Sequence, residues 1–261
     1  ARVNGVVRSI RCDGHSRVAL SRNLAPAFQA SRAVTNTKLG DDLDRRTIVI
    51  FVAALLSLWF GRFGIRYIPD TSTRLAELCW WSGTQIVSYL IVPLIVVWLV
   101  GWKPSDIGWK FRGTSRHWKY YVTLLAIAIP FVVIASTTGE FQERYPLLEI
   151  GRGQPDAWAD LRIWWIFYVL QFVAVETFFR GFLVLGLAKR FGQMSILIAT
   201  IPYLMIHFTK PPVEALAAIV GGIVMGFLAY RTKSVWWGVA LHVAVAALMD
   251  FLSLGHKGFI W

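Results

Sequence analysis

Seven apolar runs occupy most of this 261-residue chain, at residues 47–68, 78–100, 119–136, 161–187, 195–208, 213–230 and 234–252. Runs of about twenty residues cross the hydrocarbon of a bilayer as helices, because lipid offers no hydrogen bonds and the backbone must satisfy its own. Hydrophobic residues make up 56% of the chain, which is more apolar surface than one soluble core of this size needs. We therefore expect an all-α, polytopic membrane bundle of about seven transmembrane helices.

The fifth run is the least regular of the seven. It is short, at residues 195–208, and it contains Pro202. Because proline removes a backbone donor and clashes with the preceding turn, the run is expected to be kinked or to extend toward Lys210. Whether it crosses the bilayer completely is left open.

Residues 1–46 differ in composition from the rest of the chain. They hold nine Lys or Arg and four Asp or Glu, with no apolar segment long enough to cross a membrane. We interpret them as a basic polar N-terminal arm and residues 47–261 as one multi-pass membrane domain. The Arg-rich composition of the arm is typical both of organelle transit peptides and of cytoplasmic extensions, so its role stays undetermined.

The formal net charge of +12 is spread unevenly over the loops. The loops after the second, fourth and sixth runs are basic, whereas the loop after the third run is acidic, with Glu140, Glu143, Glu149, Asp156 and Asp160 against Arg144 and Arg152. The positive-inside rule therefore predicts that the N-terminus is cytoplasmic and the C-terminus lies outside. The same distribution favours membrane lipids as partners and gives no reason to expect a nucleic-acid partner.

The sixth run contains two glycines one helical turn apart, Gly222 and Gly226. A pair of small residues at this spacing lets a neighbouring helix approach closely in a membrane. We interpret the pair as a helix-packing site.

Ionisable side chains interrupt three of the apolar runs. Glu176 and Arg180 lie one helical turn apart in the fourth run, His207 closes the fifth and His242 lies within the seventh. An isolated ion pair can simply join helices, but charged groups at membrane depth are costly unless they share a polar environment. A carboxylate with two histidines suits water activation or zinc binding, and the spacing does not decide between them.

Three segments of residues 161–250 resemble the signature motifs of a known family. They are ETFFRG, YLMIHFTKPPVEAL and GGIVMGFLAYRTKSVWWGVALHVAVAAL. The family is CPBP, membrane proteins similar to CAAX prenyl endopeptidases and to bacteriocin-processing proteins, whose motifs run Glu-Glu-x-x-x-Arg, Phe-x-x-x-His and His-x-x-x-Asn or Asp. The resemblance implies helices around a hydrophilic cavity and a glutamic intramembrane endopeptidase. In it, the first glutamate and the second-motif histidine activate water, while the third-motif histidine and its Asn stabilise the oxyanion.

Four residues take family positions by this resemblance. Glu176 matches the second glutamate of the first motif and Arg180 matches its arginine. His207 matches the second-motif histidine and His242 the third-motif histidine, while Tyr203 stands where Phe is usual. These are the candidate catalytic positions.

Two departures from the motifs bear on activity. Val175 occupies the place of the first glutamate and Ala246 the place of the Asn or Asp. A general base needs a basic atom within hydrogen-bond reach, and valine has none. Glu176 is displaced from position 175 by about 100° around a helix, and Asp250 follows His242 by about 12 Å where a partner four residues on would be about 6 Å away. Neither residue is a ready substitute.

Three hypotheses follow, with the first favoured. The chain is a non-proteolytic subunit, assembly factor or binding protein of a membrane complex that keeps the fold of the family. Alternatively, it is an active endopeptidase that cuts a peptide or lipidated protein with Glu176 and His207 around water. In the third, His207 or His242 binds a metal, haem or pigment; otherwise no cofactor is expected. The resemblance also suggests the bacterial plasma membrane as the location.

Overall fold

The computed structural model of this protein describes residues 44–68, 73–151 and 154–259. All regular elements within these ranges are helical, as expected for an all-α membrane protein. Nearly all of the predicted N-terminal arm, residues 1–46, lies outside the described ranges. Contacts group residues 46–261 into one compact unit, and the description below concerns that unit alone.

The helices follow one another with few interruptions. They are α2 (Arg45–Phe63), α3 (Arg74–Ile86), α4 (Val92–Leu99), α5 (Trp118–Ser136), α6 (Gly139–Arg144), α7 (Ala157–Glu176), α8 (Gly186–Phe191), α9 (Met194–Met205), α10 (Pro212–Thr232) and α11 (Trp236–His256). A π-helical segment, Val87–Ile91, joins α3 to α4, and a second, Thr177–Leu185, joins α7 to α8. Short 3₁₀ turns lie at Gly64–Tyr67, Pro104–Ile107 and Ser115–His117.

Within the described residues, six helical stretches are long and apolar enough to cross a membrane, which confirms a multi-pass membrane protein. They are Arg45–Tyr67, Arg74–Leu99, Ser115–Ser136, Ala157–Phe191, Pro212–Thr232 and Trp236–His256. The fifth apolar run forms α9, whose 12 residues include Pro202. A helix of that length covers about 18 Å, less than the roughly 30 Å of hydrocarbon, so α9 does not span by itself.

The stretch Ala157–Phe191 is the central element of the bundle. Of its most apolar 18-residue segment, 83% is buried inside the protein, whereas the corresponding share for Ser115–Ser136 at the periphery is 11%. Its π-helical segment packs against the other π-helical segment, where the ring of Tyr89 stacks on that of Phe178 with centroids 4.7 Å apart. π-Helices are rare in proteins but are often found at functional sites. The one that begins directly after Glu176 therefore makes this part of the helix a candidate functional site.

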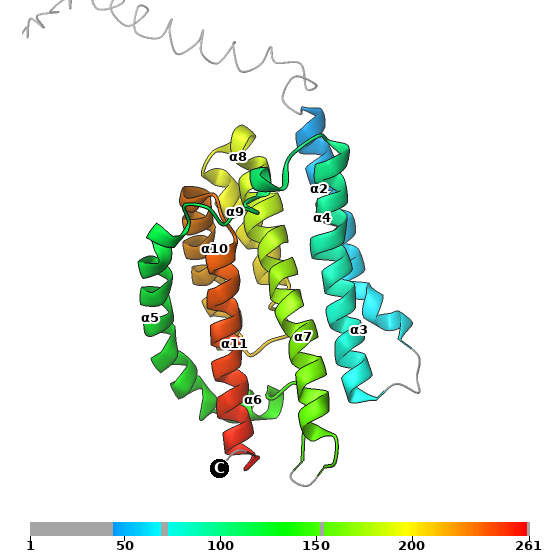
Figure 1. Cartoon of the computed structure of the whole chain (residues 1–261), viewed down its shortest axis with the longest axis vertical. Coiled ribbons are helices and arrows are strands. Elements are labelled where there is room, and N and C mark those ends of the chain that lie inside the picture. The colour runs from blue at the N-terminus through cyan, green and yellow to red at the C-terminus, as the bar shows by residue number, and fades with distance from the viewer. Residues whose placement is uncertain (1–43, 69–72, 152–153, 260–261) are drawn as a thin grey trace, which may run out of the picture. The chain divides into compact units, whose positions relative to one another are not determined.

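The basic and acidic loops lie at opposite ends of the unit (Figure 1). The connections after α4, after α8 and after α10 share one end, and the acidic segment between α5 and α7 lies at the other end with the end of α11. The helices therefore segregate the loop charges as the positive-inside argument requires of a single membrane orientation.

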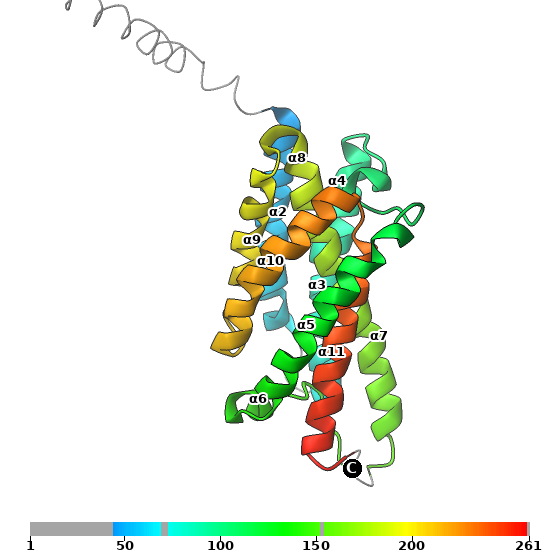
Figure 2. The ribbon, with the colours of Figure 1, turned by 90° about the vertical axis from the view of Figure 1, so that its left-hand side faces the viewer.

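Helices α9 and α10 form a close antiparallel pair, as the glycine spacing predicts. A Cβ atom at Gly222 would lie 2.8 Å from Thr200 Cγ2, and one at Gly226 would lie 2.9 Å from Ile196 Cγ2. The two backbones therefore approach closely only because these positions lack side chains. In Figure 2 the turn between α9 and α10 lies at one edge of the unit and part-way along the length of α11, short of the end at which α11 finishes.

We expect Gly226→Leu to lower the stability of the protein by about 1 to 3 kcal/mol, because the new side chain collides with Ile196 on α9. Gly221→Leu is the matched control: a Cβ at Gly221 meets nothing within 4 Å, and the gain in helix propensity is the same. Thermal unfolding in detergent micelles measures both. Equal melting temperatures for the two variants would contradict the packing assignment.

Candidate functional site

Glu176 is sealed inside the bundle between α7 and α11. Its side chain is fully buried, with Oε1 2.9 Å from His242 Nδ1 and Oε2 3.5 Å from Arg180 Nε. A Cβ atom at Gly238 would lie 2.5 Å from Glu176 Oε2. The backbone of α11 can therefore approach the carboxylate this closely only because position 238 has no side chain. A carboxylate at membrane depth needs such partners, and the protein supplies both a guanidinium and an imidazole.

Arg180 is also buried, on the side of the carboxylate that faces α9 and α10. Its guanidinium carbon lies 4.0 Å from the centroid of the Tyr203 ring, a cation–π contact, and Nη2 lies 3.9 Å from Met225 Sδ. The arginine is thus held between a carboxylate and the face of an aromatic ring. The predicted ion pair exists, and it joins α7 through Arg180 to α9 and α10.

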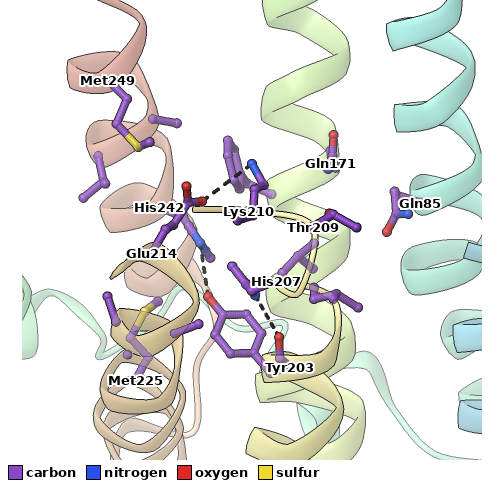
Figure 3. A pocket seen from close by; sticks show the side chains of 18 of the residues that line it. Gln85, Gln171, Tyr203, His207, Thr209, Lys210, Glu214, Met225, His242 and Met249 are labelled. Carbon is purple, nitrogen blue, oxygen red and sulfur yellow. Dashed lines mark hydrogen bonds and ion pairs between the residues drawn. The ribbon is translucent and has the colours of Figure 1, made fainter. Parts of the chain in front are cut away.

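Tyr203 connects the two histidines (Figure 3). Its hydroxyl lies 3.4 Å from His242 Nε2, and its carbonyl oxygen lies 2.8 Å from His207 Nδ1. Because a carbonyl only accepts hydrogen bonds, His207 Nδ1 must be the donor there, which leaves Nε2 as the basic nitrogen of a neutral ring. His242 has partners at both nitrogens, Glu176 at Nδ1 and Tyr203 at Nε2.

A cavity of about 450 Å³ lies between the helices, and His207 and His242 both line it. Val175 and Ala246, at the two positions where the family motifs carry polar residues, line the same cavity. Glu176 and Arg180 are not among its lining residues. The rotation of about 100° between neighbouring helix positions explains this difference, because it turns Val175 into the cavity and Glu176 away from it.

The geometry brings the four candidate catalytic residues into one connected group. Glu176 contacts Arg180 and His242, and Tyr203 links His242 to His207. Asp250 is buried, at 3% exposure, but does not line the cavity. The catalytic roles of Glu176, Arg180, His207 and His242 stay predictions from the resemblance.

Sequence reasoning missed a second polar cluster on the cavity wall. The Tyr145 hydroxyl donates to Glu214 Oε2 at 2.7 Å and accepts from Lys210 Nζ at 2.8 Å. Lys210 Nζ also lies 3.6 Å from Glu214 Oε1. Burial and the charge of Glu214 raise the pKa of Tyr145, so its hydroxyl remains a donor. The four-residue spacing of Lys210 and Glu214 was a usable signal, but Tyr145 comes from a distant loop.

A metal site receives no support from the part of the chain that the structure describes. Within it, no group of three or more His, Cys, Asp or Glu side chains is placed to hold a metal ion. His207 and His242 both point to the cavity but are separately engaged with Tyr203.

One family comparison supports the resemblance. Residues 157–248 match the family described as type II CAAX prenyl endopeptidase, Rce1-like. Neither curated proteins nor solved structures gave a match. The matched region runs from the start of α7 into α11 and includes all four candidate residues, so it confirms the resemblance found in the motifs.

We expect Arg180→Met to lower the stability by about 3 to 5 kcal/mol, because it leaves the Glu176 carboxylate without its cationic partner inside the bundle. The double variant Glu176→Leu/Arg180→Met should lose clearly less than the sum of the two single variants, since it removes both charges. Unfolding midpoints in detergent measure all three. Additive losses would show that the two side chains do not stabilise each other.

Proposed function

We propose that this chain, an integral membrane protein with a CPBP, Rce1-like domain at residues 157–248, is a non-proteolytic member of that group. It uses the retained cavity for binding and acts as a subunit or assembly factor of a membrane complex. The observation that carries the proposal is the side chain at position 175. Val175 lines the cavity at the place where the motif carries its first glutamate, and a valine cannot take a proton from water.

The nearest carboxylate does not replace the missing base. Glu176 is fully buried, and its two oxygens lie 2.9 Å from His242 and 3.5 Å from Arg180. Both oxygens of the carboxylate are therefore engaged by a partner, and the side chain does not line the cavity. To reach water in the cavity, Glu176 would have to leave both partners and turn around the helix.

The third motif also carries an apolar residue in place of a polar one. Ala246 supplies no hydrogen-bond donor on the cavity wall. The hydroxyl of Tyr203 lies 3.4 Å from His242 Nε2, so the nitrogen available for an oxyanion already faces a partner. One oxyanion donor typically stabilises the transition state by about 3 to 4 kcal/mol. In this cavity the donor at position 246 is absent, and His242 Nε2 already contacts Tyr203.

The alternative, an active endopeptidase acting on a peptide or lipidated protein, has one observation in its favour. His207 lines the cavity, and its Nδ1 contact with the Tyr203 carbonyl leaves Nε2 as a basic nitrogen. A histidine alone can act as a general base. This reading requires hydrolysis that depends on His207 without a carboxylate at position 175.

The charge of the loops and the family resemblance support a proposal for the membrane in which this protein lies. We infer a bacterial plasma membrane with the basic end of the bundle in the cytoplasm, supported by the gathering of basic loops at one end (Figure 1). The exposed apolar side chains of the spanning helices contact lipid.

A mass-spectrometric cleavage assay on reconstituted protein tests the proposal directly. Wild type should release no product from the membrane peptides of its host. Val175→Glu restores a carboxylate in the cavity that His207 also lines and should yield slow cleavage, increased when Ala246→Asn is added. Val175→Gln, of similar size but without a basic carboxylate, is the matched control and should stay inactive.

The decisive comparison is between wild type and His207→Ala. Cleavage by wild type that disappears in His207→Ala would show an active endopeptidase and overturn the proposal.

A subunit or assembly factor should also leave the membrane with its partner. After mild detergent extraction, native mass spectrometry should find this chain in a complex of fixed stoichiometry. A monodisperse monomer under conditions that keep other membrane complexes intact would contradict the subunit assignment.

A further inference from the structure

The cavity has an apolar side and a charged side. Its apolar wall comes from α5 and α10, with Leu124, Ala128, Val220, Val224 and Met225 among the lining residues. The charged residues come from the last turns of α2 and α6, from the turn between α9 and α10, and from the first turn of α10. A volume of about 450 Å³ falls within the range of small-molecule sites. This division of the lining suits a ligand with a polar head and an apolar chain.

The charges at the polar side are unbalanced. Arg62, Arg144 and Lys210 line the cavity as cations, while Glu214 is the one carboxylate among its lining residues in the described part of the chain. Lys210 and Glu214 offset each other at 3.6 Å, with Tyr145 between them. The excess is therefore positive, and it favours an anionic head group.

Arg144 is the side chain best placed to bind that head. It ends α6 directly before Tyr145, whose hydroxyl accepts from Lys210, and it lines the cavity. Among the residues that the structure describes, no acidic side chain forms an ion pair with it. A guanidinium offers a planar pair of donors that fits a carboxylate or a phosphate.

Helix α5 lies between the cavity and the bilayer. This helix is the least buried span and packs mainly along α11. Side chains of α5 and α10 line the cavity together, and only 11% of the most apolar part of Ser115–Ser136 is buried, so the outer surface of α5 is open to lipid.

We propose that the cavity binds a single-chain amphiphile with an anionic head, with the head at Arg144 and Lys210 and the chain along the wall formed by α5 and α10. The inference rests on the proposed function, under which the cavity is a binding site and not a place of hydrolysis. Carboxylate and phosphate heads share the required chemistry. A free fatty acid and a lipid phosphate are therefore both candidates, and the experiment separates them.

The test uses the full chain in nanodiscs of zwitterionic lipid and four probes with the same sixteen-carbon chain. They are palmitate, hexadecyl phosphate, hexadecanol and hexadecyltrimethylammonium, each measured for saturable binding above that of empty nanodiscs. At least one of the two anionic probes should saturate and bind about tenfold or more tightly than the other two, as expected for a charge-assisted contact. Palmitate alone would identify a carboxylate ligand, and hexadecyl phosphate alone a phosphate ligand.

Two variants locate the head and the chain. Arg144→Gln should weaken the anionic probe by about tenfold and leave hexadecanol unchanged. Gly221→Trp should abolish binding of the anionic probe, because Gly221 lines the cavity and a Cβ there meets nothing within 4 Å. Gly83→Trp is the matched control, since Gly83 has the same open surroundings but lies away from the cavity. It should bind as wild type does.

The proposal is overturned if no anionic probe saturates, if hexadecanol binds equally well, or if Gly221→Trp leaves binding intact. Its failure is distinct from failure of the proposed function. An inactive wild type that binds no anionic probe would remove this inference alone, whereas cleavage dependent on His207 would remove the proposed function whatever the probes do.

Discussion

The bundle depends on how it accommodates one buried carboxylate. Glu176 lies at membrane depth with no exposure, where an uncompensated charge would cost several kcal/mol. Its contacts with Arg180 and His242, and the close approach permitted by Gly238, tie the central helix to α11. The stacking of Arg180 on Tyr203 extends the same network to α9. Helices from both ends of the Rce1-like region are thus joined by one set of polar contacts.

This arrangement separates support of the fold from the chemistry of the cavity. Glu176 and Arg180 do not line the cavity, whereas Val175 and His242 do. Replacing the cavity-facing glutamate by valine therefore removes a group that could meet water without disturbing the buried network. A domain built in this way can change the polar residues of its cavity and keep its helices in place.

The fold was largely predictable from sequence because hydrophobic length and the need for internal hydrogen bonds leave few options in lipid. The shortness of the fifth run and the close packing at Gly222 and Gly226 could also be predicted, from run length and from the spacing of small residues. Glu176, Arg180, His207 and His242, which were singled out from the motifs, lie in one connected group, and their catalytic roles stay predictions. The contact of Tyr203 with His242 was not predicted, because the effect of one added hydroxyl depends on how two separate helices approach. The Tyr145, Lys210 and Glu214 cluster was missed because the tyrosine comes from a loop 65 residues before Lys210 and 69 before Glu214.

The shortness of α9 has a consequence for the surrounding bilayer. Since α9 stops after about 18 Å and the chain turns back short of the end at which α11 finishes, fewer helices cross the leaflet at the acidic end than at the basic end. The protein therefore displaces unequal areas of lipid in the two leaflets.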